Sequence, residues 1–201
     1  MKVVSLFSGA GGLDLGFIKA GHQILWANDL YGDAVETYRK NIGSHIVCED
    51  ITKVDAADIP DCDIVIGGFP CQGFSVANTK RHEDDERNIL YRQLIRVIQE
   101  KKPKFFLAEN VKGILSIGKG QVFQMILNDF RSMGYKVKYQ VLNAADYGVP
   151  QTRLRVIIVG VRNDIDFDFQ YPKPTNSKDG ADGLPRWVSV SEALSSIPSP
   201  D

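Results

Sequence analysis

Cys71 is the residue of this sequence that is best suited to covalent chemistry. It lies in the segment Gly67-Gly68-Phe69-Pro70-Cys71-Gln72-Gly73-Phe74-Ser75, directly after a short apolar run. Open α/β folds bind ligands beyond the carboxyl ends of their strands, and loops there carry functional side chains. A thiol in such a loop can act as a nucleophile, and the alternative is a small buried apolar side chain. Cys48 and Cys62 lack this context and are interpreted as structural.

A glycine-rich turn offers a second place for a ligand. It runs Phe7-Ser8-Gly9-Ala10-Gly11-Gly12-Leu13, between a predicted strand and a predicted helix. Glycines let a ligand approach the backbone, and the free N–H groups at a helix start favour a carboxylate or a phosphate. The spacing departs from the dinucleotide pattern G-x-G-x-x-G, and such turns also serve plain packing. The turn by itself leaves both interpretations open.

Acidic residues follow the next two predicted strands. Asp29 ends the second strand, where doubly wound nucleotide-binding folds place an acid that accepts hydrogen bonds from ribose hydroxyls. Asp50 and Ile51 follow the third strand and could offer a polar contact and an apolar wall to an adenine ring. A helix cap or a solvated loop acid is the alternative for Asp29.

The elements that must position these residues alternate between β-rich runs and amphipathic stretches. Strands are predicted at residues 3–7, 23–27, 45–48, 64–67, 105–108, 137–142 and 156–161, and helices at residues 13–20, 34–41, 90–100 and 122–133. Gly134 is placed to end the last of these helices. This order predicts an α/β fold with an open, mostly parallel sheet and helices on both faces. From Asp168 onward Pro and Gly break the periodicity, which leaves one short helix at residues 189–195.

Composition bounds the class of protein. The 201 residues, 43% of them hydrophobic, suffice for one sizeable core, and the net charge of −1 gives no general sign of nucleic-acid binding. The three cysteines have no metal-like spacing, so we expect neither a zinc site nor a disulfide framework. Without a long apolar run or a secretory signal, we expect a cytoplasmic protein.

Further motifs join the segment around Cys71 in a fixed order. They are Ser5-Leu6-Phe7-Ser8-Gly9-Ala10-Gly11-Gly12-Leu13-Asp14-Leu15-Gly16-Phe17, Glu109-Asn110-Val111 and Gln151-Thr152-Arg153-Leu154-Arg155. Together they resemble the bacterial DNA cytosine-5 methyltransferases over about residues 2–174. The resemblance implies a Rossmann-like, S-adenosylmethionine-dependent methyltransferase fold that acts on double-stranded DNA, commonly in a restriction-modification system.

The resemblance also implies catalytic roles. Cys71 would form a covalent adduct with C6 of a cytosine, and Glu109 would hydrogen-bond N3 of the same base. Arg153 and Arg155 would contact the base carbonyl oxygen or flanking phosphates. Because the thiol cannot reach a base inside a duplex, the cytosine must be flipped out, and residues 73–88 would be the loop that closes over it.

For S-adenosylmethionine, the resemblance assigns the ring of Phe7 to the adenine, the backbone of residues 9–13 to the methionine carboxylate, and Asp29 to the ribose. The other predicted cofactor contacts are Ser8, Leu30, Asp50, Ile51, Pro70 and Leu90. Two positions depart from the family. Some members have Asp where this chain has Ser5, and an aromatic residue often stands in place of Leu30.

The sequence divides into a catalytic and cofactor-binding region, residues 1–174, and residues 175–201, a linker or the start of a target-recognition region that the chain lacks. We therefore expect the missing C-terminal half, in cis or as a second chain, to be a partner. Three hypotheses stay open: the catalytic half of a DNA methyltransferase, an RNA-directed member of the family, and a non-catalytic cofactor-binding or regulatory module.

Overall fold

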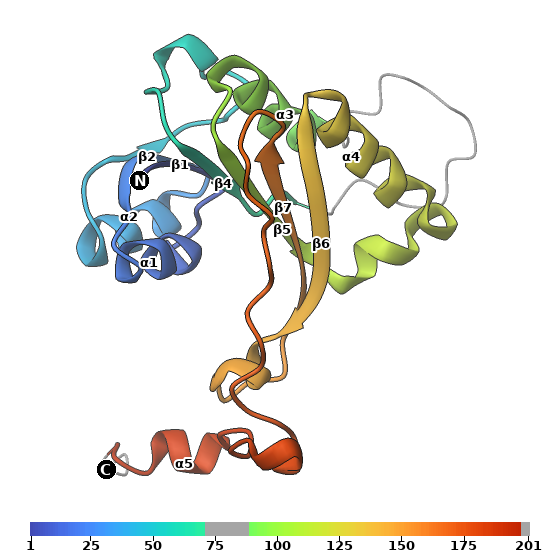
Figure 1. The fold of residues 1–201 in the computed structure, drawn as a ribbon. Coiled ribbons are helices and arrows are strands. Elements are labelled where there is room, and N and C mark those ends of the chain that lie inside the picture. The colour runs from blue at the N-terminus through green and yellow to red at the C-terminus, as the bar shows by residue number, and fades with distance from the viewer. Residues whose placement is uncertain (71–88, 198–201) are drawn as a thin grey trace.

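A seven-stranded sheet forms the centre of the molecule. The computed structural model describes residues 1–70 and 89–197, and its strands lie in the order β3-β2-β1-β4-β5-β7-β6 (Figure 1). The strands are β1 Lys2–Leu6, β2 Gln23–Asp29, β3 Ile46–Cys48, β4 Ile64–Gly67, β5 Phe105–Val111, β6 Tyr135–Asn143 and β7 Leu154–Arg162. Strands β1 to β5 pair in parallel, and β7 runs antiparallel to both β5 and β6. The predicted mostly parallel sheet is confirmed.

Helices cover both faces of this sheet, as predicted. On one face α1 (Gly12–Lys19) and α2 (Gly32–Asn41) pack on alternate residues of the first strands, with Val3 and Tyr38 in a shared core. On the other face α3 (Ile89–Lys101) and α4 (Gln121–Ser132) bury Leu94 and Ile126 against the opposite side of the same strands. Figure 1 shows the two pairs of helices on either side of the sheet. The period-2 alternation of β1, with Val3 on one side and Val4 on the other, produces the two cores.

Strands β5 and β7 extend beyond their predicted bounds, and the extension matters for the site. The prediction ended β5 at Ala108 and began β7 at Val156, whereas the antiparallel ladder pairs Asn110 with Val156 and Val111 with Arg155. Ladder hydrogen bonds carry both strands past their apolar centres into polar residues. Arg155 and the Glu109-Asn110 pair therefore lie within a rigid sheet.

The turn between β1 and α1 needs glycine at one position. Gly11 has a φ of 87°, and a Cβ atom there would lie 2.8 Å from the ring of Tyr38 and 2.1 Å from Ile42. Only glycine tolerates both the left-handed backbone and the close approach of α2. Gly134, with a φ of 86°, follows the end of α4, which confirms the predicted stop.

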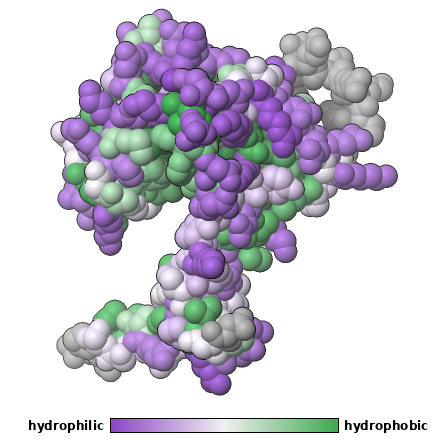
Figure 2. Space-filling model, viewed as in Figure 1, coloured by the Kyte–Doolittle hydropathy of each residue, from purple (hydrophilic) through white to green (hydrophobic). Residues whose placement is uncertain are grey.

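After β7 the chain runs back along the sheet and then leaves it as a projecting arm (Figure 1). The arm ends in α5 (Val190–Leu194), which begins with a capping box between Ser189 and Glu192, so the predicted short helix is confirmed. Trp187 anchors the arm, because its Nε1 donates to Oδ1 of Asp146 at 2.9 Å. Apolar side chains are exposed on the arm beyond this anchor (Figure 2), and they are Val190, Leu194 and Ile197.

Candidate active site

Two neighbouring cavities lie at the carboxyl edge of the parallel strands. They share Phe7, which follows β1, and Gly68, which follows β4. This edge is where doubly wound folds bind ligands, because the strand ends and the following loops converge there. A larger, open hollow of about 570 Å³ lies at the start of α4, and no predicted site residue lines it.

The first cavity, of about 210 Å³, gathers one group of predicted cofactor contacts. Its walls include Phe7, Asp29, Leu30, Asp50, Ile51, Pro70 and Leu90. The lining thus combines apolar side chains, which suit a flat ring, with the carboxyl groups of Asp29 and Asp50. The backbone N–H and the hydroxyl of Thr52 both donate to Oδ1 of Asp50, and these bonds lower the pKa of that carboxyl.

Asp29 ties the glycine turn to the end of β2. Its Oδ2 accepts from the backbone N–H of Gly9 at 2.7 Å, and its Oδ1 accepts from the N–H of Tyr31 at 3.0 Å. The hydroxyl of Ser8 strengthens the same junction by donating to the carbonyl oxygen of Asn28 at 2.9 Å. A carboxylate has about four lone-pair sites, so Asp29 keeps acceptor capacity toward the cavity. It both orders the turn and offers an acceptor for hydroxyl groups.

Phe7 has an unusual backbone. Its φ of 55° puts a bulky residue in the left-handed region, a conformation that costs energy and is concentrated at functional sites. The residue comes directly after β1, so this conformation turns the chain sharply where the two cavities meet. This left-handed backbone therefore occurs at the residue whose ring, by the family resemblance, is expected to stack on the adenine of the cofactor.

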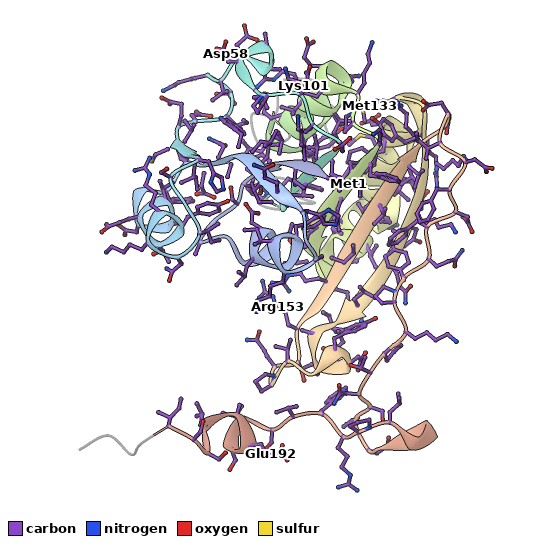
Figure 3. The ribbon with its side chains drawn as sticks, turned by 60° about the vertical axis from the view of Figure 1, so that its left-hand side comes forward. Met1, Asp58, Lys101, Met133, Arg153 and Glu192 are labelled. Carbon is purple, nitrogen blue, oxygen red and sulfur yellow. The ribbon has the colours of Figure 1, made fainter. Side chains whose placement is uncertain are left out.

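The second cavity, of about 390 Å³, is lined by predicted catalytic residues and by the two ends of the turn. Its walls are Ser5, Leu6, Phe7, Ser8, Gly12, Leu13, Gly68, Glu109 and Arg153. Figure 3 shows Arg153 at the edge of the sheet where β7 begins. The structure therefore brings Glu109 and Arg153 to the same space as the start of α1. The turn residues Gly9, Ala10 and Gly11 line neither cavity, although Gly9 holds the turn through Asp29.

Glu109 is paired with Arg155. The Nε of Arg155 lies 2.7 Å from Oε1 of Glu109, and the two side chains are each about three-quarters buried. The pairing register explains the contact: Arg155 lies opposite Val111, so Glu109, two residues away on the same face, is its diagonal neighbour. The other oxygen, Oε2, would lie 3.1 Å from a Cβ atom at Gly68, so glycine there leaves room for the carboxylate. Arg155 was expected to contact the base carbonyl oxygen or flanking phosphates, and here its side chain positions Glu109.

Asn110 fixes the loop that leads to Cys71. Its buried Nδ2 donates to the carbonyl oxygen of Phe69 at 2.9 Å, and its Oδ1 accepts from the N–H of Val111 at 2.8 Å. Cys71 and the predicted closing loop, residues 73–88, lie outside the described residues. The bond from Asn110 nevertheless ties the strand of Glu109 to the residue two positions before the thiol.

Sequence reasoning missed several residues of the first cavity, namely Asn28, Tyr31 and Glu49. Tyr31 carried a signal, since members of the family often have an aromatic residue at the position of Leu30, and Tyr31 stands one position later. The Nδ2 of Asn28 donates to the carbonyl oxygen of Glu49 at 2.8 Å, which joins the ends of β2 and β3. That role depends on strand pairing and has no sequence signature.

The two described cysteines differ in environment. Cys48 is exposed, whereas burial raises the pKa of the Cys62 thiol to about 12. Among residues 1–70 and 89–197, no three His, Cys, Asp or Glu side chains gather in a way that could hold a metal ion. In the same part of the chain, no helix is both long and apolar enough to span a membrane.

The fold is the Rossmann-like fold of the S-adenosylmethionine-dependent methyltransferases. The C-5 cytosine-specific DNA methylase family matches residues 1–199, and the chain belongs to this family. It is 50% identical to the type II methyltransferase M.NgoFVII of Neisseria gonorrhoeae over 98% of this chain and 53% of that protein. It is 44% identical to M.MthTI of Methanothermobacter thermautotrophicus over 100% of this chain and 58% of that protein.

Solved structures agree with the fold. An E. coli prophage protein described as a DNA modification methyltransferase superimposes with a TM-score of 0.78 at 32% identity, over 100% of this chain and 56% of that one. The Dnmt2 methyltransferase of S. pombe matches in fold, with a TM-score of 0.70 at 24% identity, over 85% of this chain and 53% of that one. The chain spans about half the length of these relatives.

Family membership implies S-adenosylmethionine as the methyl donor, and the residues present fit it. The first cavity has apolar walls for the adenine ring, and the carboxylate of Asp29 can accept from ribose hydroxyls. The second cavity is lined by Gly12 and Leu13 at the start of α1, and the positive end of a helix suits the methionine carboxylate. Phe7 and Gly68, common to both cavities, lie where the two halves of such a ligand join.

Proposed function

We propose that this chain is the catalytic part of an enzyme that transfers a methyl group from S-adenosylmethionine to C5 of a flipped-out cytosine in double-stranded DNA. The observation that carries the proposal is the junction of the two cavities at Phe7 and Gly68. One cavity has the walls of a nucleoside site, and the other contains Glu109 and Arg153. A base inserted next to Glu109 would therefore face the methyl-donor end of the cofactor.

The cofactor, when bound, supplies an electrophilic methyl group on its sulfonium. Cytosine C5 is a poor nucleophile, so the thiolate of Cys71 adds to C6 and makes C5 reactive. C5 takes the methyl group, its proton leaves, and the sulfur of Cys71 is then eliminated. This assignment of Cys71 rests on its place after Pro70, which lines the first cavity.

Glu109 holds the base in the proposed complex. Its carboxyl group lies at the cavity wall and, when it carries a proton, donates to N3 of the cytosine, which makes C6 more electrophilic. Arg155 orients that carboxyl group through its 2.7 Å contact. Arg153 lines the same cavity, and its guanidinium would donate to the base carbonyl oxygen or a phosphate. Asn110 keeps the loop before Cys71 at a fixed place relative to Glu109.

Double-stranded DNA and a target-recognition region are the proposed partners. The type II methyltransferases M.NgoFVII and M.MthTI are nearly twice as long as this chain, which supports a further region in cis or on a second chain. Residues 175–201 would lead from the catalytic region, residues 1–174, toward it. The names of these relatives support a setting in restriction and modification.

Methyl transfer tests the proposal. The chain, alone and together with the region that a longer relative carries in addition, is incubated with radiolabelled S-adenosylmethionine and either unmethylated duplex DNA or transfer RNA. Digestion to nucleosides should yield labelled 5-methyldeoxycytidine from DNA, and Glu109→Gln should abolish it. Label in 5-methylcytidine from RNA alone would identify an RNA-directed enzyme, and cofactor binding without transfer to either substrate would identify a non-catalytic module.

A further inference from the structure

A buried carboxylate lies behind the glycine turn and takes no part in the site described so far. Asp14 is fully buried in the first turn of α1. Its Oδ1 accepts from the hydroxyl of Ser5 at 2.7 Å, and its Oδ2 accepts from the hydroxyl of Tyr38 at 2.8 Å. Nε2 of His45 lies 3.0 Å from the same Tyr38 oxygen. The network joins β1, α1 and α2 around one acid.

This arrangement suits an ionised carboxylate. Both oxygens accept a hydroxyl hydrogen, and the first turn of a helix stabilises negative charge. Burial raises the pKa of Asp14, and the hydrogen bonds from Ser5 and Tyr38 oppose that rise. Tyr38 donates its only hydroxyl hydrogen to Asp14, so its oxygen can only accept a hydrogen from Nε2 of His45. Both of these hydrogen bonds therefore run toward the carboxyl group of Asp14.

The carboxylate lies next to the wall of the second cavity. Ser5, which donates to it, lines that cavity, and so do Gly12 and Leu13, which come immediately before it in the chain. Within the described residues Asp14 forms no ion pair with Lys or Arg. The basic group that faces it is His45, which lies beyond the Tyr38 hydroxyl and whose charge opposes the rise in the pKa of Asp14. A charge in such a poorly solvated place acts over a longer range than one at the surface.

The ligands of this cavity differ in charge. S-adenosylmethionine carries a carboxylate, an ammonium and a sulfonium, with a net charge of +1, whereas its product S-adenosylhomocysteine has a neutral thioether and no net charge. A buried anion near the methionine end stabilises the first more than the second. A loss of turn geometry, in contrast, would weaken both ligands alike.

We propose that Asp14 is a specificity-determining residue whose buried charge favours the sulfonium cofactor over the neutral thioether product. The inference rests on the proposed binding of S-adenosylmethionine in these cavities. Asp14 touches neither ligand and acts across the wall formed by Ser5 and Gly12. Its effect promotes exchange of product for fresh cofactor after each methyl transfer.

Calorimetric titration of the full chain with each ligand separately tests this proposal. Asp14→Asn keeps the shape and removes the charge, and it should lower the ratio of S-adenosylmethionine to S-adenosylhomocysteine affinity about tenfold. A tenfold change corresponds to about 1.4 kcal/mol, a size that one unit charge can exert on another inside a protein. Tyr38→Phe is the matched control, because it removes a hydrogen bond and keeps the charge, so the ratio should stay within about twofold.

The outcomes separate the two proposals. If the wild-type chain binds neither ligand, cofactor binding itself is refuted. If it binds both and Asp14→Asn weakens both by the same factor, or leaves both unchanged, the charge proposal is overturned while cofactor binding stands. Circular dichroism and thermal melting establish that each variant is folded. Asp14→Ser, which also removes the charge and fits the same space, replaces the Asn variant if that variant does not fold, and the same ratio decides.

Discussion

The Nε of Arg155 lies 2.7 Å from Oε1 of Glu109, so an arginine of the last strand in the chain orients the carboxylate of β5. The contact depends on the antiparallel pairing of β5 and β7, which places the two side chains diagonally on one face. Arg155 lines neither cavity, whereas Glu109 lines the second one. Arg155 is therefore a positioning residue in this state of the chain.

Replacing Arg155 should slow methyl transfer and leave cofactor binding intact. Arg155→Gln frees Glu109 from its partner, and we expect a roughly tenfold to hundredfold lower single-turnover rate. Arg155→Lys should restore part of the rate because it keeps the charge and loses the planar fork. Arg162→Gln, at the other end of β7 and paired with exposed Asp164, is the control. An unchanged rate in Arg155→Gln would show that the pair has no catalytic role.

Asn110 should matter for both stability and activity. Asn110→Ala leaves the carbonyl oxygen of Phe69 without its donor in a buried place, which costs about 1–3 kcal/mol in the free energy of unfolding. Asn110→Asp should lower the free energy of unfolding further, because a carboxylate oxygen then faces the carbonyl oxygen of Phe69. Denaturant unfolding measures the change, with Asn128→Ala on α4 as an exposed control. Equal stabilities for the two alanine variants would contradict the role of this bond.

Asp29 should control cofactor affinity. Asp29→Ala removes the acceptor for the N–H groups of Gly9 and Tyr31 and for the ribose hydroxyls, so affinity for S-adenosylmethionine should fall about tenfold to a hundredfold. The shift in melting temperature on adding the cofactor reports the loss. Asp33→Ala, exposed in the first turn of α2, should keep the wild-type shift. If the Asp29→Ala variant keeps the wild-type shift in melting temperature, the ribose does not bind at Asp29.

The described cysteines should differ in reactivity toward iodoacetamide. The pKa of Cys62 is raised to about 12, so its thiol stays protonated at pH 8 and its labelling increases only as the pH approaches that value. Cys48 is exposed and should be labelled at pH 8 within minutes. Peptide mass spectrometry follows both sites in one sample. Rapid labelling of Cys62 in the folded chain at pH 8 would contradict the conclusion that this thiol is buried and has a raised pKa.

Much of the fold follows from local pattern. The apolar runs of β1 and β4 and the helical periodicity of α3 and α4 predict the parallel sheet and its two layers of helices, because burial dictates both periods. The first cavity was also predictable, since Asp29, Asp50 and Pro70 each follow a predicted strand and carboxyl ends meet at one edge.

The remaining features depend on tertiary pairing. The antiparallel direction of β7 sets the contact between Arg155 and Glu109, and no spacing in the sequence specifies that register. The left-handed backbone of Phe7 is likewise imposed by its surroundings, because a bulky residue does not favour that conformation by itself. The acid of the Asp14 network was not singled out, since its partners Ser5 and Tyr38 are distant in sequence.

The most direct test of the central claim is mass spectrometry for a covalent adduct on Cys71. The chain, supplied with the additional region of a longer relative, is incubated with S-adenosylmethionine and duplex DNA that contains 5-fluorocytosine. Release of Cys71 requires loss of the proton at C5, and the fluorine that replaces it cannot leave in this way. The proposed chemistry therefore predicts a stable adduct on the peptide of Cys71 and none on Cys48 or Cys62. Cys71→Ser should abolish it. A wild-type enzyme that binds the cofactor and DNA and forms no adduct, or a Cys71→Ser variant that still does, would contradict the account.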